Sequence, residues 1–398
     1  MQALADLLQS VRIGMARSPR RIPRPWAMWM GLTCAVAAGW GCRRHEDQAQ
    51  RWQTPPSDRV LEVTASPTGD LVAVTTESRV PARASVWIVA AEPMRPLPRL
   101  VAQGRESFGP PVWRPDGQAL IATLLAEDMG GRLYLADTTR ASTAEAVAKP
   151  PSAWPMYPAW SPDGTRLVWM ETNARNETYL SIMEVDTRAV RRLATTRAPG
   201  PPAWSPTGRW IAFAGRGDPK GAGEGAEGAD APAQLYVMAP DGTGERAVPN
   251  SERLRRWVWG SSQELLCRTT GPDGSQLSIF TLNVLTGGRK ALLEGLALPG
   301  RWTATDGRPF WDPGHRRLLG TVELPVGDGE RVSSGTAVVS VDLAEGTVRQ
   351  LTTGPADSCP AWMGDGEHIA FVRDDEALWV MATDGSDQRR VLGLRDLR

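Results

Sequence analysis

Residues 158–164 (Pro158-Ala159-Trp160-Ser161-Pro162-Asp163-Gly164) decide the fold, because the chain repeats this stretch. It recurs at 202–208 as PAWSPTG and at 111–117 as PVWRPDG. Looser copies are 360–366 (PAWMGDG), 257–261 (WVWGS) and 309–314 (PFWDPG), and 64–69 (TASPTG) opens the series without a tryptophan. The anchors of the seven copies are Ala65, Trp113, Trp160, Trp204, Trp259, Trp311 and Trp362. Their spacing of about 44 to 55 residues is typical of propeller blades.

The repeated motif has the chemistry of a tight turn followed by a strand. Proline presets φ at the first corner of the turn, aspartate tolerates the second, and glycine accepts the positive φ that leads into the next strand. The tryptophan before the turn supplies a wide ring that suits the wedge between neighbouring twisted sheets. Each copy therefore predicts a hairpin with an aromatic residue at its start.

Short apolar strands follow every turn, as at 71–75, 120–124, 167–170, 210–214, 265–268, 318–322 and 369–372. A second strand alternates with period two, and a polar outer strand ends each unit; no window shows a helical stripe. A single sheet of this kind cannot bury both faces, so stacking in a ring provides the core. We predict an all-β fold, a seven-bladed β-propeller of four-stranded antiparallel blades, with six or eight blades as alternatives.

These repeats resemble those of the TolB-like β-propeller family over roughly residues 60–392. The resemblance implies a periplasm-facing propeller that binds proteins or peptides through its rim or central channel. TolB itself has six blades and a preceding α/β domain, whereas this chain shows seven anchors and no such domain. No binding residue is carried over from the family.

The N-terminal region has the order of a secretion signal. Basic residues precede an apolar run from Trp26 to Gly41, which is too short for a permanent span of about 20 residues and ends at Cys42. The cysteine after Gly39 and Gly41 resembles the lipobox of bacterial lipoproteins, which implies an acylated Cys42 as the mature N-terminus; ordinary cleavage near Ala38 is the alternative. We predict a signal peptide over 1–41, a lipidated N-terminus and flexible tether over 42–57, and the propeller over 58–398.

The charge balance of the chain excludes one class of partner. The 45 Lys and Arg residues balance the 45 Asp and Glu residues, so the chain has no basic excess to bind nucleic acid.

Cys267 and Cys359 fall in non-adjacent units and are expected to be buried free thiols. Residues 215–233, rich in Gly, Ala, Glu and Asp, predict a disordered insertion. Residues 323–335 predict a second, loop-like insertion that lengthens the hairpin of the sixth unit.

Candidate catalytic groups are few. His315 and His368 lie near equivalent turns and could approach each other, but no zinc-binding spacing accompanies them. Asp163, Asp241, Asp273 and Asp384 are interpreted as turn formers, and 374–376 (DDE) as a solvated hairpin tip. The arginine pairs at 191–192, 255–256 and 389–390 suggest either an anion-binding surface or charges that protect outer strands.

The sequence therefore predicts a cell-envelope lipoprotein whose propeller is a non-catalytic scaffold for a protein or peptide. We expect a monomer without cofactor or metal, anchored through Cys42, facing the periplasm and sited at the outer membrane. A soluble periplasmic or secreted protein is the alternative location. The alternative function is a propeller enzyme of the lyase or lactonase type that acts on an envelope or extracellular saccharide.

Overall fold

The structure is a computed structural model of the whole chain. It describes residues 58–69, 71–79, 82–91, 98–105, 107–125, 131–139, 144–148, 153–175, 177–196, 200–215, 233–252, 254, 256–303, 311–312, 314–326, 333–354 and 356–397. The predicted signal peptide, Cys42 and the tether lie outside the described residues, as do residues 216–232 of the predicted insertion. No helix in the part of the chain that the structure describes is long and apolar enough to span a membrane.

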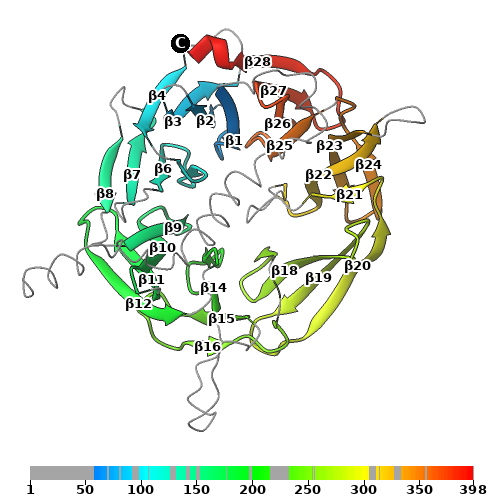
Figure 1. Cartoon of the computed structure of the whole chain (residues 1–398). Coiled ribbons are helices and arrows are strands. Elements are labelled where there is room, and N and C mark those ends of the chain that lie inside the picture. Colours follow the sequence, from blue (N-terminus) through cyan, green and yellow to red (C-terminus); the bar gives the residue numbers. More distant parts are fainter. Residues whose placement is uncertain are drawn as a thin grey trace, which may run out of the picture.

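Seven four-stranded antiparallel sheets stand in a ring around a central axis (Figure 1). The strands of the first four blades are β1 (Asp58–Ala65), β2 (Leu71–Arg79), β3 (Ala82–Ala90), β4 (Arg99–Gly104); β5 (Val112–Trp113), β6 (Ala119–Leu124), β7 (Arg132–Asp137), β8 (Glu145–Ala148); β9 (Ala153–Trp160), β10 (Arg166–Asn173), β11 (Thr178–Glu184), β12 (Val190–Thr196); β13 (Ala203–Trp204), β14 (Ile211–Gly215), β15 (Gln234–Met238) and β16 (Arg246–Ala247). Those of the last three are β17 (Trp257–Trp259), β18 (Glu264–Thr270), β19 (Gln276–Asn283), β20 (Arg289–Ala297); β21 (Arg301–Trp302), β22 (Arg317–Val326), β23 (Ser333–Asp342), β24 (Thr347–Gln350); β25 (Asp357–Trp362), β26 (His368–Arg373), β27 (Ala377–Ala382) and β28 (Arg389–Gly393). A 3-10 helix, η2 (Leu394–Leu397), follows β28.

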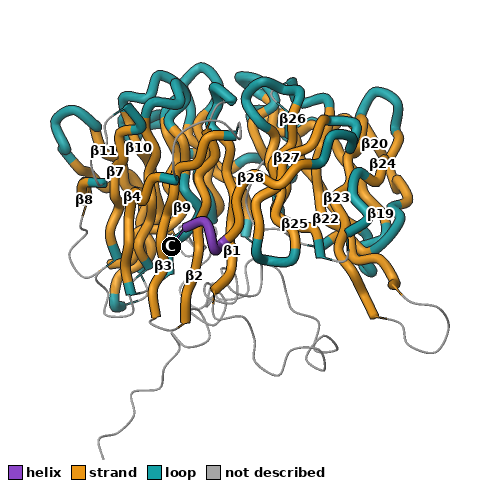
Figure 2. The backbone as a smooth tube through the Cα atoms, turned by 90° about the horizontal axis from the view of Figure 1, so that it is seen from above, coloured by secondary structure: helices purple, strands orange, loops and turns teal. Residues whose placement is uncertain are grey.

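Each blade is built from consecutive strands, and the first strand of each lies nearest the axis (Figure 1). Seen edge-on, the strands run between two faces of the ring, and one face is formed by short turns (Figure 2). The predicted seven-bladed propeller is therefore confirmed.

The anchor residue has the same register in each blade. Trp160 pairs with Leu167, Trp204 with Ile211, and Ala65 with Val72 at the head of the second strand. In blade six Trp311 makes only an isolated bridge to Leu318, while β21 begins earlier in the chain. The eroded sixth copy thus keeps its anchor position outside β21.

The anchor tryptophans join neighbouring blades by hydrogen bonds as well as by packing. The indole Nε1 of Trp160 donates to the carbonyl of Val112 at 3.1 Å, and that of Trp204 donates to Ala159 at 3.1 Å. Trp113 donates to Thr64, and Trp259 donates to Ala203. In each pair the acceptor directly precedes the anchor of the previous blade, so the bond reproduces itself from blade to blade.

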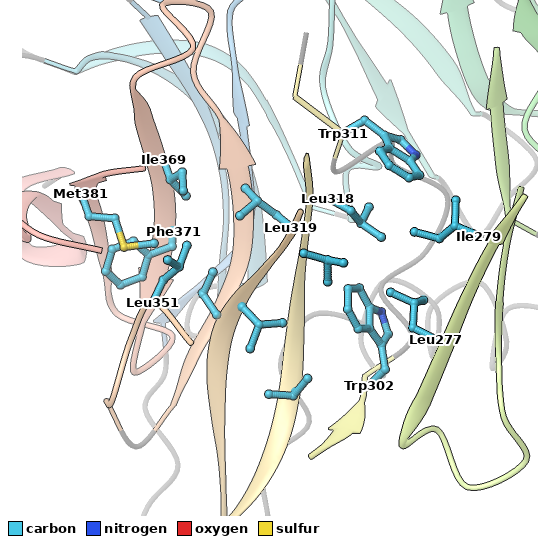
Figure 3. Packing of buried hydrophobic residues seen from close by; sticks show 14 of the residues in the cluster. Leu277, Ile279, Trp302, Trp311, Leu318, Leu319, Leu351, Ile369, Phe371 and Met381 are labelled. Atoms are coloured by element: carbon cyan, nitrogen blue, oxygen red, sulfur yellow. The ribbon is translucent and has the colours of Figure 1, made fainter. Parts of the chain in front are cut away.

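The hydrophobic core lies between the blades. One cluster joins blades five, six and seven, with Ile279 on β19, Leu318 on β22 and Phe371 on β26 (Figure 3). These side chains are at most 2% exposed. Burial of each such residue contributes about 1.5–3 kcal/mol. Adjacent blades therefore stabilise each other, whereas a single blade would leave these side chains exposed.

The ring closes without strand exchange, because β1 to β4 and β25 to β28 form separate complete sheets. A mixed hydrophobic cluster joins them, including Val63 from blade one and Ala370 from blade seven. The backbone N–H of Val60 donates to the carbonyl of Asp375 at 2.7 Å. Closure therefore depends on hydrophobic packing and on isolated hydrogen bonds across the junction.

One expectation about the sixth blade was partly wrong: the insertion lengthens the hairpin as predicted, but its described ends are strands. Residues 323–335 were predicted to be loop-like, yet β22 and β23 pair through Glu323 with Thr336 and on to Val326 with Ser333. The insertion lengthens both strands.

Candidate functional site

The turn aspartates are occupied by their own turns. Asp163 Oδ1 accepts bonds from the hydroxyl of Ser161 at 2.5 Å and from the N–H and hydroxyl of Thr165. The hydroxyl of Ser161 holds the pKa of Asp163 below its ordinary value. Asp241, Asp273 and Asp384 accept bonds from the residue two positions later in the same way. Their interpretation as turn formers is confirmed.

The two histidines have separate local partners. His315 has a φ of 52°, and its N–H donates to the carbonyl of Asp312, as the N–H of Gly164 does to Ser161 in the equivalent turn. Its ring packs edge-on against Trp311, and burial lowers its pKa. His368 Nδ1 lies 2.8 Å from Asp365 Oδ2. Both side chains are therefore engaged by the turns that carry them.

The predicted arginine pairs lie on outer strands in two of three cases. Arg191 on β12 donates to the carbonyls of Pro240 and Asp241 in the next blade, and Arg192 pairs with the buried Glu171 at 2.7 Å. Arg390 on β28 pairs with Asp396 of η2 at 3.1 Å. Both strands are sheet edges, so these charges lie where unpaired strand edges need protection.

The outer strands also share a pattern that the sequence alone did not reveal. One position on the outer strand lies in line, across the sheet, with the second-strand residue that follows the partner of the anchor. This position carries a cation in every blade except the second. Its occupants are Arg99, Glu145, Arg191, Arg246, Lys290, Arg349 and Arg389. Arg99, like Arg191, donates to a carbonyl of the next blade, that of Asp137 at 2.8 Å. Variable spacing along the chain hides this position, and only the strand register aligns it.

Blade seven contains a closed polar network. Asp357 is fully buried and accepts a bidentate pair from Arg373, at 2.7 and 2.9 Å. The guanidinium also donates to Gln388 and lies over the ring of Trp379. Beside it, Asp374 forms the predicted hairpin tip, and desolvation raises its pKa. The network satisfies its own donors and acceptors, so it stabilises the blade.

The third predicted arginine pair leads to a different environment. Arg255 lies outside the described residues, but the carbonyl of Arg256 accepts the backbone N–H of Arg268 at 3.0 Å. The guanidinium of Arg268 lies 4.9 Å from the ring centroid of Trp302 in blade six. Burial, with the nearby charge of Arg256, lowers the pKa of Arg268 to about 10. Sequence reasoning named Arg256 and missed Arg268, because an isolated arginine in an apolar strand carries no motif.

That environment contains unsatisfied hydrogen-bond donors. Within the described ranges, Arg268 Nη1 and Trp302 Nε1 are both buried and have no hydrogen-bond partner. Such a buried donor typically costs about 1–3 kcal/mol. We call Arg268 and Trp302 together the arginine–tryptophan pair; it is the strongest candidate for a ligand site in the described part of the propeller.

The two cysteines that the structure describes are buried thiols. Cys267 and Cys359 are both free and buried, as predicted. Burial raises the pKa of Cys267 to about 12, which keeps its thiol protonated. Among the described residues, no group of three or more His, Cys, Asp or Glu side chains is arranged to hold a metal ion.

Comparison with known proteins identifies the fold. No protein-family model and no curated protein sequence matches the chain. Among solved structures, an oligogalacturonate lyase in complex with manganese matches with a TM-score of 0.56 and 15% identity, covering 87% of this chain and 93% of that chain. The β-propeller domain of the Trilobed protease from Pyrococcus furiosus, which has an open velcro topology, matches with a TM-score of 0.56 and 11% identity, covering 84% and 98%.

TolB from Acinetobacter baumannii is also similar, with a TM-score of 0.46 and 16% identity, covering 80% of this chain and 69% of that chain. The β-propeller fold expected from the repeats is shared with the lyase and protease-domain structures, whose TM-scores are 0.56. At such identities the comparisons establish architecture alone. The described chain is a seven-bladed β-propeller in which every blade is a complete four-stranded sheet.

Proposed function

We propose that the protein is a cell-envelope lipoprotein whose propeller is a non-catalytic scaffold for a protein or peptide. One observation carries this proposal: the aspartates of the repeated turns and His368 are bonded within their own turns, as Asp163 is by Ser161 and Thr165 and as His368 is by Asp365. A group held in this way positions a loop and is not poised to transfer a proton to a substrate. The order of the N-terminal segment supports export and acylation at Cys42.

In this proposal the lipid holds the propeller at the periplasmic side of the outer membrane as a monomer. Two or three acyl chains give stable anchoring, because each buried methylene contributes about 0.8 kcal/mol. Replacing Cys42 by Ser is expected to abolish palmitate labelling and membrane fractionation. Replacing Cys34 by Ser, within the predicted signal peptide, is the matched control and should change neither. Unchanged fractionation of the Cys42→Ser protein would contradict the anchor.

Binding is tested by cross-linking in intact cells followed by mass spectrometry of the captured complexes. The anchored protein is expected to capture one or a few envelope proteins above the level of a lipoprotein control without the propeller. Capture no greater than the control would contradict the scaffold function.

The alternative is a propeller enzyme of the lyase or lactonase type. The fold shared with an oligogalacturonate lyase gives this alternative a concrete assay. A lyase would release an unsaturated sugar from an acidic saccharide, and its ultraviolet absorbance would report turnover with and without manganese. Turnover that survives purification would replace the scaffold proposal.

A further inference from the structure

We propose that the arginine–tryptophan pair between blades five and six binds a carboxylate of an acidic peptide segment. This inference rests on the proposed scaffold function and names the chemistry of its partner. It is carried by two buried N–H donors that lack an acceptor, on two side chains that lie against each other.

The first step is the position of Arg268. It lies on β18 three residues after Leu265, the residue that pairs with the anchor Trp259. The same position in other blades holds Thr75, Thr123, Met170, Ala214, Thr321 and Val372. Among these positions only blade five places a full charge between blades. An arginine there must desolvate its guanidinium, which destabilises the protein unless an anion compensates.

The second step is the aromatic surface beside it. Trp302 is 5% exposed and packs over Gly320 so closely that a Cβ at Gly320 would overlap the indole ring. In Figure 3 the indole lies beside Leu318 of its own blade and faces Leu277 of blade five. Other blades place an aromatic ring at the Gly320 position itself, as with Trp169, Phe213 and Phe371. Blade six instead supplies the ring from its first strand, which directs the indole toward Arg268.

The third step is the local charge. Arg256 is close enough to disfavour the charged form of Arg268, so the two cations repel each other. The neighbouring Arg301 is mostly exposed and lies near Glu323, at 3.8 Å. No ion pair joins Arg268 to a carboxylate among the residues that the structure describes. An incoming carboxylate would therefore relieve repulsion and satisfy a donor at the same time.

The donor chemistry favours a carboxylate. A guanidinium N–H and an indole N–H both donate to anionic oxygens, and the charge-assisted bond from the guanidinium is the stronger kind. Arg268 as a residue is partly exposed, whereas its Nη1 atom is buried, so an incoming carboxylate reaches Nη1 only when the side chain turns toward solvent. The surrounding side chains are apolar and buried, with Leu277 and Leu318 among them. They offer no hydrogen-bond partner to the hydroxyls of a saccharide.

The test uses the indole N–H signal of Trp302 in ¹⁵N-labelled full-length protein in detergent, assigned with Trp302→Phe. The probe is the peptide acetyl-Gly-Leu-Glu-Leu-Gly-amide, with its glutamine counterpart as control. The glutamate peptide is expected to shift the signal. The glutamine peptide is expected to bind at least roughly tenfold more weakly. Equal binding of the two peptides, or no shift with either, would overturn the proposal. A shift with digalacturonate alone would assign the site to saccharides and overturn the peptide class.

Variants separate binding from folding. Arg268→Met is expected to lose the response to the glutamate peptide, Arg268→Lys to retain a weakened one, and Arg301→Met, the matched control, to behave as the parent. The thermal midpoint of Arg268→Met should equal or exceed that of the parent, because the variant removes a buried donor without an acceptor. A clear fall in that midpoint would assign Arg268 a structural role and count against the proposal.

Cross-linking in cells distinguishes this inference from the proposed function. If both hold, Arg268→Met captures partners at a strongly reduced level while Arg301→Met captures them normally. If Arg268→Met captures the same partners as the parent, the scaffold stands and the carboxylate site is wrong. If the parent itself captures nothing above control, the scaffold function has failed independently of the site.

Discussion

The junctions between early blades and the junction that closes the ring are built differently. In blades two to five, each anchor tryptophan donates its indole N–H to the preceding blade, as Trp204 does to Ala159. Blade one has Ala65 at the anchor, so no indole reaches back to blade seven. There Gly364 approaches Pro67 and Gly69 so closely that an added Cβ would overlap Pro67.

The difference shows two solutions to one packing problem. A tryptophan fills the wedge and bonds at a defined point, so it specifies both distance and register between blades. Glycine instead allows two backbones to touch, so the closing junction depends on shape and on short contacts such as Cys359 Sγ to the carbonyl of Leu61 at 3.6 Å. The ring is thus held by side-chain bonds along its early junctions and by close backbone packing where its ends meet.

The largest expected effect comes from breaking an early junction. Trp204→Ala removes a buried ring and should lower the free energy of unfolding by about 3–5 kcal/mol. Trp204→Phe keeps most of the ring and loses the bond to Ala159, so it should cost about 1 kcal/mol. Urea unfolding measures both. Equal losses in the two variants would mean that the hydrogen bond, and not the ring, defines the junction.

Gly364→Ala tests the closing junction by forcing its backbones apart. We expect a loss of about 1–3 kcal/mol, since overpacking displaces the facing turn. Gly314→Ala is the matched control in the turn of blade six, where an added Cβ meets only ordinary contacts, the nearest at 3.8 Å. A Gly364→Ala protein as stable as the control would show that the ring closes without that close approach.

The turn bonds predict an acid-dependent contribution. Because the pKa of Asp163 is lowered in the folded protein, this group stabilises the fold above its unfolded pKa, near the ordinary value of 3.8. That stabilisation is lost as the pH falls through the lowered pKa. The stability difference between the parent and Asp163→Asn, measured by urea unfolding, should therefore be present at pH 6 and shrink below about pH 4. A difference independent of pH would contradict this assignment.

The smallest effect is expected at His315. This residue adopts a positive φ that glycine adopts at Gly164 and Gly366 of equivalent turns. His315→Gly should therefore relieve strain and leave the free energy of unfolding equal or higher by at most about 1 kcal/mol, which the thermal midpoint reports. A marked fall would reveal that the contact of the imidazole with Trp311 outweighs the backbone strain.

The repeat made the blade number, the strand order and the turn chemistry predictable. Residues such as Trp160 and Gly164 report local requirements, namely a ring at the blade wedge and a left-handed corner. Residues 323–326 and 333–335 misled because their composition is that of a loop, whereas the ladder between β22 and β23 decides their conformation. The candidate site escaped prediction for a related reason: Arg268 and Trp302 come from different blades, and no local spacing relates them.

By itself the sequence determined a ring of seven sheets, since every copy of the motif encodes its own hairpin and an apolar face that must be covered. Only the tertiary structure decided how the ring closes and where charge is left uncompensated. Both depend on contacts between residues far apart in the chain, such as Gly364 with Pro67 and Arg268 with Trp302. Local propensity cannot specify such contacts, because their energies arise only once neighbouring blades are packed.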